Sequence, residues 1–395
     1  MANSPGPFCL TLPADGGQST KWVTTRFLKK LARDFFSLPA GLYGEDLQDV
    51  VECTSRLLRS MGKDAVLKVL RRPQLHVFLC CALSAMREQG LPLARVRARQ
   101  LLFQLLFELS VEGRLESEIV WDAALPSRRL VSPTHRLVMT IPEDAESIVF
   151  GKGCRAIGGD IVESPDDFPG VGTRFVLSLE DSNPMSDFEA HPDKEGNQIS
   201  LGSAEVSDWV SSISDALKII NEHLPGIHRE MEMVLQQFIP VGTDDEKHLS
   251  ASYQESIGTA YLTLHPQLMT MVEAIIHEFQ HNKINMLFQL EPVMENAFSP
   301  LYSSPVRPDP RPLHGVMLAA HAFVPVAELY RRLRASGSPL SRRGGFGERF
   351  RKIVNNNTAA IDVLVENARP TRLGQAIIDE MVGLNREHQL SLEGV

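Results

Sequence analysis

The chain has 395 residues, enough for two or three domains or for one large elaborated domain. Its apolar share (43%) and charged share (23%) are those of an ordinary globular protein. The formal net charge of −9 excludes a general nucleic-acid-binding protein, because no part of the chain concentrates enough Lys and Arg to neutralise a phosphate backbone.

The cysteines and the apolar runs favour an intracellular chain without membrane spans. The longest apolar run, residues 75–86, is too short to cross a bilayer, so we expect a buried helix there. The N-terminal sequence lacks the basic start and apolar core of a secretion signal. We therefore expect a cytoplasmic protein with no membrane partner. An odd set of cysteines without CxxC spacing favours a reducing compartment over a disulfide framework: Cys9, Cys53, Cys80, Cys81 and Cys154.

Residues 1–115 are predicted to form an N-terminal helical region. Apolar residues recur there at three- and four-residue spacing in the segments 24–36, 45–62 and 95–113. Gly62 marks a C-terminal stop for the second of these helices. Nothing in the pattern of this region indicates chemistry.

Residues 116–205 are predicted to be rich in β-strands. Glycine, proline and aspartate interrupt β-prone runs at 135–141, 147–162 and 172–179. A helix is then expected across residues 207–238, with a break at Pro225-Gly226.

Residues 206–395 are predicted to be the helical metal-binding catalytic region. After the broken helix we expect a strand at 261–264 and a helix at 271–290. A proline-rich loop follows, and further helices are expected at 313–335, 347–368 and 371–388.

The segment MVEAIIHEFQHNKINMLFQL, residues 271–290, carries the strongest chemical signal. His277 and His281 are one helical turn apart, so their imidazoles project from one face and can bind one metal ion. Glu278 is rotated about 100° from His277 and could reach a metal-bound water. This HExxH spacing, after a predicted strand, is typical of zincins. The expected fold class is α+β, mostly helical, with the N-terminal helical region followed by a zincin-like region of a small sheet and the HExxH helix.

The third metal ligand is open between several residues. The strict continuation HExxHxxGxxH is absent, because Ile284 and Phe288 occupy the glycine and third histidine positions. His321 is the preferred candidate, with His314 and Glu328 as alternatives, because the three are seven residues apart and drift only about 20° per step along one helix face.

Two segments resemble a known family. HEFQHNKINMLFQL, followed by YSSPVRPDPRPLHGVMLAAHAFVPVAELY, resembles the bacterial HExxH-motif peptide-modification family, whose members accompany clusters for ribosomally made, modified peptides. The resemblance is strongest over residues 249–332. It implies an enzyme that uses Fe(II) and 2-oxoglutarate to hydroxylate an unactivated carbon in a peptide.

The resemblance also implies roles for individual residues. His277 and His281 would be iron ligands, and His321 lies in the helix that could supply a third. A usual non-haem iron triad has two histidines and one carboxylate, which keeps Glu328 and Glu278 as candidates.

The loop SPVRPDPRP is a candidate binding element for 2-oxoglutarate. Arg307 and Arg311 are four residues apart, and prolines stiffen the chain around them. Arginine is well shaped to hold a carboxylate through two parallel hydrogen bonds. Arg311 is favoured because it adjoins the histidine-bearing helix, and Tyr302 could bond the same co-substrate. The competing interpretation is that the arginines pair with Asp309 and anchor the loop.

Other residues near the motif are predicted to be exposed to solvent, to pair with a peptide or to line the site. Asn282 and Lys283 are expected on solvated helix faces. The strand at 256–264 is a candidate edge for pairing with an extended peptide, and Gly258 would permit a close backbone approach. Ser252 and Tyr253 are candidates to line the site, by analogy of fold.

Three functions compete. The favoured one is an Fe(II)/2-oxoglutarate-dependent hydroxylase of a peptide side chain, whose partner is a ribosomally made precursor peptide. The first alternative is a Zn(II) metallopeptidase with Glu278 as general base. The second alternative is an inactive peptide-binding protein. The motif alone favours the peptidase, whereas the resemblance and the arginine loop favour the oxygenase.

Overall fold

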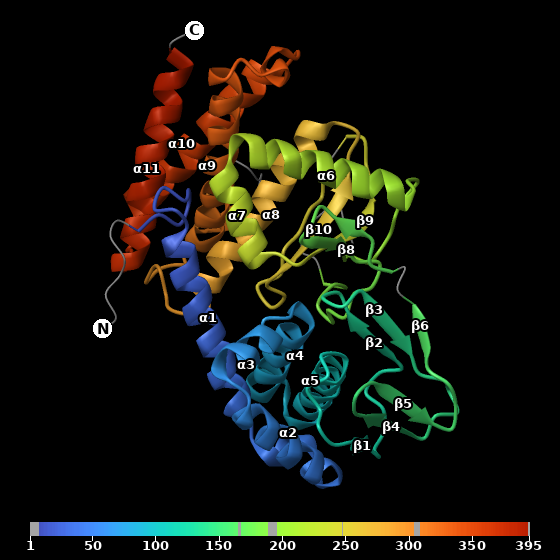
Figure 1. Ribbon diagram of the computed structural model, residues 1–395. Helices are drawn as coiled ribbons and strands as arrows, with labels where there is room; N and C mark the ends of the chain where they lie inside the picture. The colour runs from blue at the N-terminus through green and yellow to red at the C-terminus, as the bar shows by residue number, and fades with distance from the viewer. Residues whose placement is uncertain (1–7, 165–166, 189–195, 247, 304–308, 394–395) are drawn as a thin grey trace.

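The computed structural model describes residues 8–164, 167–188, 196–246, 248–303 and 309–393. Over these residues the protein is α+β and mostly helical, with small sheets, as the sequence predicts. The helices and strands form one connected arrangement, in which β1–β6 lie beside α1–α5 and the C-terminal helices lie at the opposite end (Figure 1).

Five α-helices form the N-terminal part. The apolar run at 75–86 is a buried helix, as expected, and α2 ends just before Gly62, as predicted. Gly62 is also the N-cap of the next helix, α3. The bounds are α1 Gln18–Phe36, α2 Gln48–Ser60, α3 Lys63–Leu70, α4 Pro73–Ser84 and α5 Leu91–Val111.

Short strands follow, where the β-prone runs predict them. Two antiparallel three-stranded sheets have the orders β1-β4-β5 and β2-β3-β6. The strands β1, β2 and β7 lie outside the predicted β-prone runs. The bounds are β1 Ile119–Trp121, β2 Arg129–Ser132, β3 Leu137–Thr140, β4 Ser147–Phe150, β5 Cys154–Ile157, β6 Val162–Ser164, β7 Gly170–Val171 and β8 Phe175–Leu177.

A four-stranded sheet of order β10-β9-β8-β7 supports the motif-bearing helix. Strands β9 (Gln237–Thr243) and β10 (Thr259–Leu264) are parallel, and β8 adds to β9 in parallel. The preceding helix is broken as expected, into α6 (Val206–His223) and α7 (Pro225–Val234), because proline cannot continue a helix and here begins the next one. The predicted end at residue 238 is wrong, because residues 237–238 already belong to β9, where they pair with β8 and β10.

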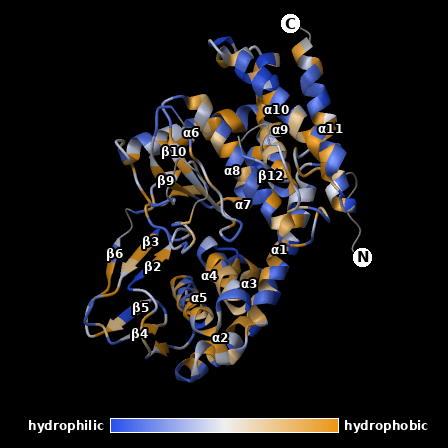
Figure 2. Cartoon of the chain, turned by 180° about the vertical axis from the view of Figure 1, so that it is seen from behind, coloured by the Kyte–Doolittle hydropathy of each residue, from blue (hydrophilic) through white to orange (hydrophobic). Residues whose placement is uncertain are grey.

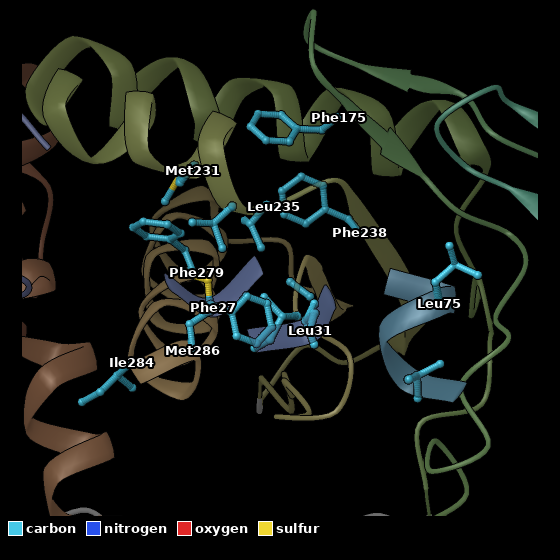
Figure 3. Packing of buried hydrophobic residues seen from close by; sticks show 14 of the residues in the cluster. Phe27, Leu31, Leu75, Phe175, Met231, Leu235, Phe238, Phe279, Ile284 and Met286 are labelled. Carbon is cyan, nitrogen blue, oxygen red and sulfur yellow. The ribbon is translucent and has the colours of Figure 1, made fainter. Parts of the chain in front are cut away.

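Helix α8 (Leu268–Phe288) carries the HExxH motif and runs through the middle of the protein. Phe279 and Met286 lie on one side of it and pack towards α1 and α7, near Phe27 and Met231 (Figure 3). His277 and His281 are each about 160° around the helix axis from Phe279 and so project from the opposite side. The expected helix at 271–290 is confirmed, with bounds shifted by two or three residues.

Three helices complete the described chain. Helix α9 (Leu313–Ala335) is long and apolar enough to cross a membrane, but 72% of its apolar window is buried inside the fold, as in a core helix. Helices α10 (Phe346–Asn367) and α11 (Arg372–Glu393) show hydrophilic and hydrophobic residues along the same helix (Figure 2), which is typical of helices at a surface. Between α8 and α9 lie the two-residue strands β11 (Leu301–Tyr302) and β12 (Arg311–Pro312).

Specific hydrogen bonds join the N-terminal helices to this part. The backbone N–H of Ile257 donates to His76 Nδ1 (3.1 Å), and Gln236 Nε2 donates to the carbonyl of Arg71 (3.0 Å). Gly258 has φ +103°, and a Cβ at this position would lie 3.0 Å from Pro73 Cγ, so a larger residue would crowd Pro73.

Candidate metal centre

A cavity of about 470 Å³ lies against the polar side of α8. Its wall is formed by α8, by the small residues of α9 and by residues 248–252 in the connection between β9 and β10. Two arginines, Arg311 and Arg349, complete the lining.

His277 and His281 are adjacent in this cavity. Their ring centroids are 4.2 Å apart, with the planes at 79°, because residues four apart on a helix lie one above the other. Both rings are half-buried and line the cavity. Neither Nδ1 atom has a hydrogen-bond partner among the described residues.

Both imidazoles are held in the neutral form. Burial lowers the pKa of His281 to about 4, and the neighbouring His314 acts in the same direction. Burial also lowers the pKa of His277 well below its ordinary value, assisted by the charges of His281 and His248. A neutral imidazole has a lone pair for a metal, so these two residues suit a divalent ion.

Glu278 is buried and engaged through both carboxylate oxygens. Ser250 Oγ donates to Oε1 (2.5 Å) and Ser252 Oγ donates to Oε2 (2.7 Å). Glu278 lines the cavity, but these bonds direct its carboxylate towards residues 248–252. Ser252 lines the cavity, as expected, whereas Tyr253 does not.

Arg311 lines the cavity and lies in β12. Its Nε atom is 2.9 Å from Asp309 Oδ2, an ion pair without the direction of a hydrogen bond, and this is the pairing that the competing interpretation of the loop predicts. No hydrogen bond to a described residue is found for its two terminal nitrogens. Tyr302 pairs with Arg311 across the β11–β12 ladder but is not part of the cavity wall, and Arg307 lies outside the described residues.

The three residues of α9 that were candidate ligands do not line the cavity. His321 is fully buried beside Lys283 and the Leu10 backbone, and neither of its ring nitrogens makes a hydrogen bond of good geometry. His314 packs between the rings of Phe288 and Phe298.

Glu328 belongs to a separate ionic cluster. His388, Arg331 and Arg332 all hydrogen-bond its carboxylate. Burial acts to raise the pKa of Glu328, but these hydrogen bonds outweigh burial and hold the pKa well below its ordinary value. The carboxylate is thus already fully occupied.

The phase of α9 explains this outcome. Each residue turns the helix by about 100°, so His314 and His321 lie about 140–160° around the axis from the cavity-lining Ala319, and Leu318 marks the edge of the cavity-lining face. The seven-residue spacing correctly places the three candidates on one face, but that face packs into the protein.

No protein-family model matches the chain, and no curated protein matches it.

Two expectations about α8 are wrong. Asn282 and Lys283 are fully buried rather than solvated. The Asn282 side chain accepts from Gly258 N (2.7 Å) and donates to the carbonyl of Thr259 (3.0 Å), and Lys283 pairs with Glu230 (2.8 Å). Short-range periodicity could not reveal these bonds, because every partner comes from a distant segment.

The expected peptide-pairing edge is also partly covered. Strand β10 is at the edge of its sheet, but Ala251 and Tyr261 exchange both of their backbone hydrogen bonds, each 3.0 Å long. Residues 248–252, not β10, thus face the cavity.

Sequence reasoning missed three cavity residues: His248, Glu273 and Arg349. Glu273 precedes His277 by one turn, which is a signal that helical spacing could have revealed. It accepts hydrogen bonds from Tyr330 and from Arg349 of α10. His248 and Arg349 come from segments that carry no local motif.

Proposed function

We propose that this protein is a metal-dependent oxygenase that uses Fe(II) and 2-oxoglutarate to hydroxylate a side chain of a peptide. The observation that carries the proposal is one cavity lined by two adjacent neutral imidazoles and by an arginine whose terminal nitrogens make no hydrogen bond to a described residue. The first feature suits a metal, and the second suits the distant carboxylate of 2-oxoglutarate.

Each group has a distinct role in this proposal. His277 and His281 would hold the iron. Arg311 would bind the carboxylate that does not contact metal, and the ion pair with Asp309 would orient its guanidinium. Bound iron would supply the oxidising chemistry, in which one atom of O₂ enters the alcohol, the other enters succinate, and CO₂ leaves.

The zincin-like arrangement and the membership of the HExxH-motif peptide-modification family belong to the same proposal. They are supported by the HExxH helix behind a small sheet, and by residues 248–252 running antiparallel to β10 above the motif. The cavity is large enough for a co-substrate and one peptide side chain. A cytoplasmic location and a ribosomally made precursor as the peptide remain part of the hypothesis.

The zinc peptidase is less well supported. A general base in a peptidase must present a carboxylate oxygen to metal-bound water, whereas both oxygens of Glu278 accept bonds from Ser250 and Ser252.

Succinate formation tests the proposal. Purified protein is mixed anaerobically with Fe(II) and 2-oxoglutarate, oxygen is admitted, and succinate is measured. We expect succinate from the wild type and none from His277→Ala. For Arg311→Gln we expect a KM for 2-oxoglutarate roughly 10- to 100-fold higher, the equivalent of a lost charge-assisted pair. The exposed Arg174→Gln is the matched control and should leave the KM unchanged.

Two results would contradict the oxygenase proposal or replace it. The oxygenase proposal is wrong if the iron-loaded wild type forms no succinate. Zinc-dependent cleavage of a peptide that is lost in Glu278→Gln would instead establish the peptidase.

A further inference from the structure

A metal bound by the two histidines needs a further ligand, and the carboxylates of helix α8 are engaged elsewhere. Both oxygens of Glu278 accept hydrogen bonds from Ser250 and Ser252. Sites of this kind use at least three protein ligands. Glu273 lies eight residues before His281, which is about 12 Å along the helix axis, so the two cannot share one ion with His277. Glu273 is moreover held by Tyr330 and Arg349.

The third ligand must therefore come from another wall of the cavity. The candidates on α9 face elsewhere, and the α9 residues that do line the cavity have no ligating side chain: Gly315, Leu318, Ala319 and Phe323. The remaining wall is residues 248–252.

Residues 248–252 are fixed on two sides. Ala251 pairs with Tyr261 of β10, and Thr263 Oγ1 donates to the carbonyl of Leu249 (3.2 Å). On the side facing α8, Ser250 and Ser252 donate to Glu278, the residue next to His277. This anchoring holds the start of the segment over the paired imidazoles.

His248 is the first residue of this segment and lines the cavity with His277 and His281. Within the described ranges, no group of three or more His, Cys, Asp or Glu is already at coordinating distance, so ligation by His248 requires its side chain to move towards His277 and His281.

We infer that His248 supplies the third protein ligand of the metal centre, and that Glu278 is a positioning residue that holds the His248-bearing segment over His277 and His281. The inference rests on the metal centre of the proposed function, but not on the identity of the reaction. It gives the motif glutamate a structural task, fixed through Ser250 and Ser252.

Cobalt(II) binding tests this inference without any assay of activity. Apo-protein is titrated with Co(II), and affinity and visible absorption are recorded for the wild type and His248→Ala. We expect His248→Ala to bind Co(II) at least 10-fold more weakly with an altered visible spectrum. His321→Ala is the matched control, a buried histidine outside the cavity, and should keep the wild-type affinity within twofold.

A cysteine variant at the same position separates loss of a ligand from loss of the fold, because it should gain a new absorption band. In His248→Cys, a thiolate at the metal adds a sulfur-to-cobalt charge-transfer band in the near ultraviolet, which unfolded protein at one equivalent of Co(II) should not reproduce. His321→Cys should show no such band. The Glu278→Gln variant should retain Co(II) but with roughly 10-fold weaker binding, and His248→Ala should add little further loss in that background, because both changes remove the same ligand.

The inference is overturned if His248→Ala binds Co(II) like the wild type, or if Co(II)-bound His248→Cys lacks the band. Its failure is separable from that of the proposed function. Co(II) ligation by His248 without succinate formation refutes only the oxygenase, whereas succinate formation with wild-type affinity in His248→Ala refutes only this ligand.

Discussion

Helices α8 and α9 both carry histidines at regular spacing and both are mostly buried, but they relate to the cavity in opposite ways. On α8, His277 and His281 line it. On α9, His314 is packed between phenylalanines and His321 is enclosed in the core. The comparison teaches that a helix face rich in ionisable residues can serve packing as readily as chemistry, and that only the neighbouring segments decide which.

The polar groups on the core side of α8 should have the largest effect on stability. Lys283 and Glu230 form a fully buried ion pair. Lys283→Ala leaves the Glu230 carboxylate buried without its partner, so we expect the free energy of unfolding to fall by about 3–5 kcal/mol. Urea denaturation measures this.

Two further variants test whether the loss of stability comes from the buried Lys283–Glu230 ion pair. Lys218→Ala, on the exposed side of α6, should change stability by less than about 0.5 kcal/mol. The double variant Lys283→Met, Glu230→Leu should recover most of the loss. Equal stability of Lys283→Ala and the wild type would mean that the pair contributes nothing.

A buried histidine outside both helices, His76, should make the free energy of unfolding depend on pH. Burial lowers the pKa of His76 to about 4, whereas the unfolded chain takes up a proton near pH 6.5. The stability that this residue contributes is therefore present above pH 6.5 and is lost as the pH falls towards 4, by roughly 3 kcal/mol.

Replacing His76 by Gln removes this titration. The difference in unfolding free energy between pH 7 and pH 4.5 should shrink by about 2 kcal/mol relative to the wild type. An identical pH dependence in the two proteins would contradict the assignment.

On α9, Glu328 should matter for stability but not for metal. Its carboxylate is shared by Arg331, Arg332 and His388. Glu328→Gln should lower the free energy of unfolding by about 1–3 kcal/mol, because hydrogen bonds to a charged group are weakened. The metal affinity of the variant, measured by titration, should stay within twofold of the wild-type value. A tenfold loss of affinity would indicate that Glu328 is a metal ligand.

The smallest effect is expected at His321. Its buried ring nitrogens lack good hydrogen bonds, so His321→Leu should leave the free energy of unfolding unchanged or slightly raised. Thermal denaturation measures this, and a loss of several kcal/mol would show that the ring has a partner that matters.

Sequence patterns within a single segment predicted the elements that depend on that segment alone. The helix of the HExxH motif, the break at Pro225 and the strand before the motif all follow from patterns within one segment, and they are confirmed. The adjacency of His277 and His281 follows from the helix repeat alone.

The rest of the candidate site depends on contacts between distant segments. Residue spacing assigns His321 to a face of α9 but does not say what packs on that face. His248 and Arg349 reach the cavity only through tertiary folding, and Asn282 is buried because a glycine from the preceding strand donates to it. No pattern within the chain carries that information.

The central claim is that the imidazoles of His277 and His281 on α8 together bind one divalent metal ion. Anaerobic equilibrium dialysis against Fe(II), followed by elemental analysis, tests it in the wild type and in the His277→Ala and His281→Ala variants. We predict one iron per chain in the wild type and at least 100-fold weaker binding in either variant. Absence of bound iron in folded wild-type protein, or full retention of iron in both variants, would contradict the account.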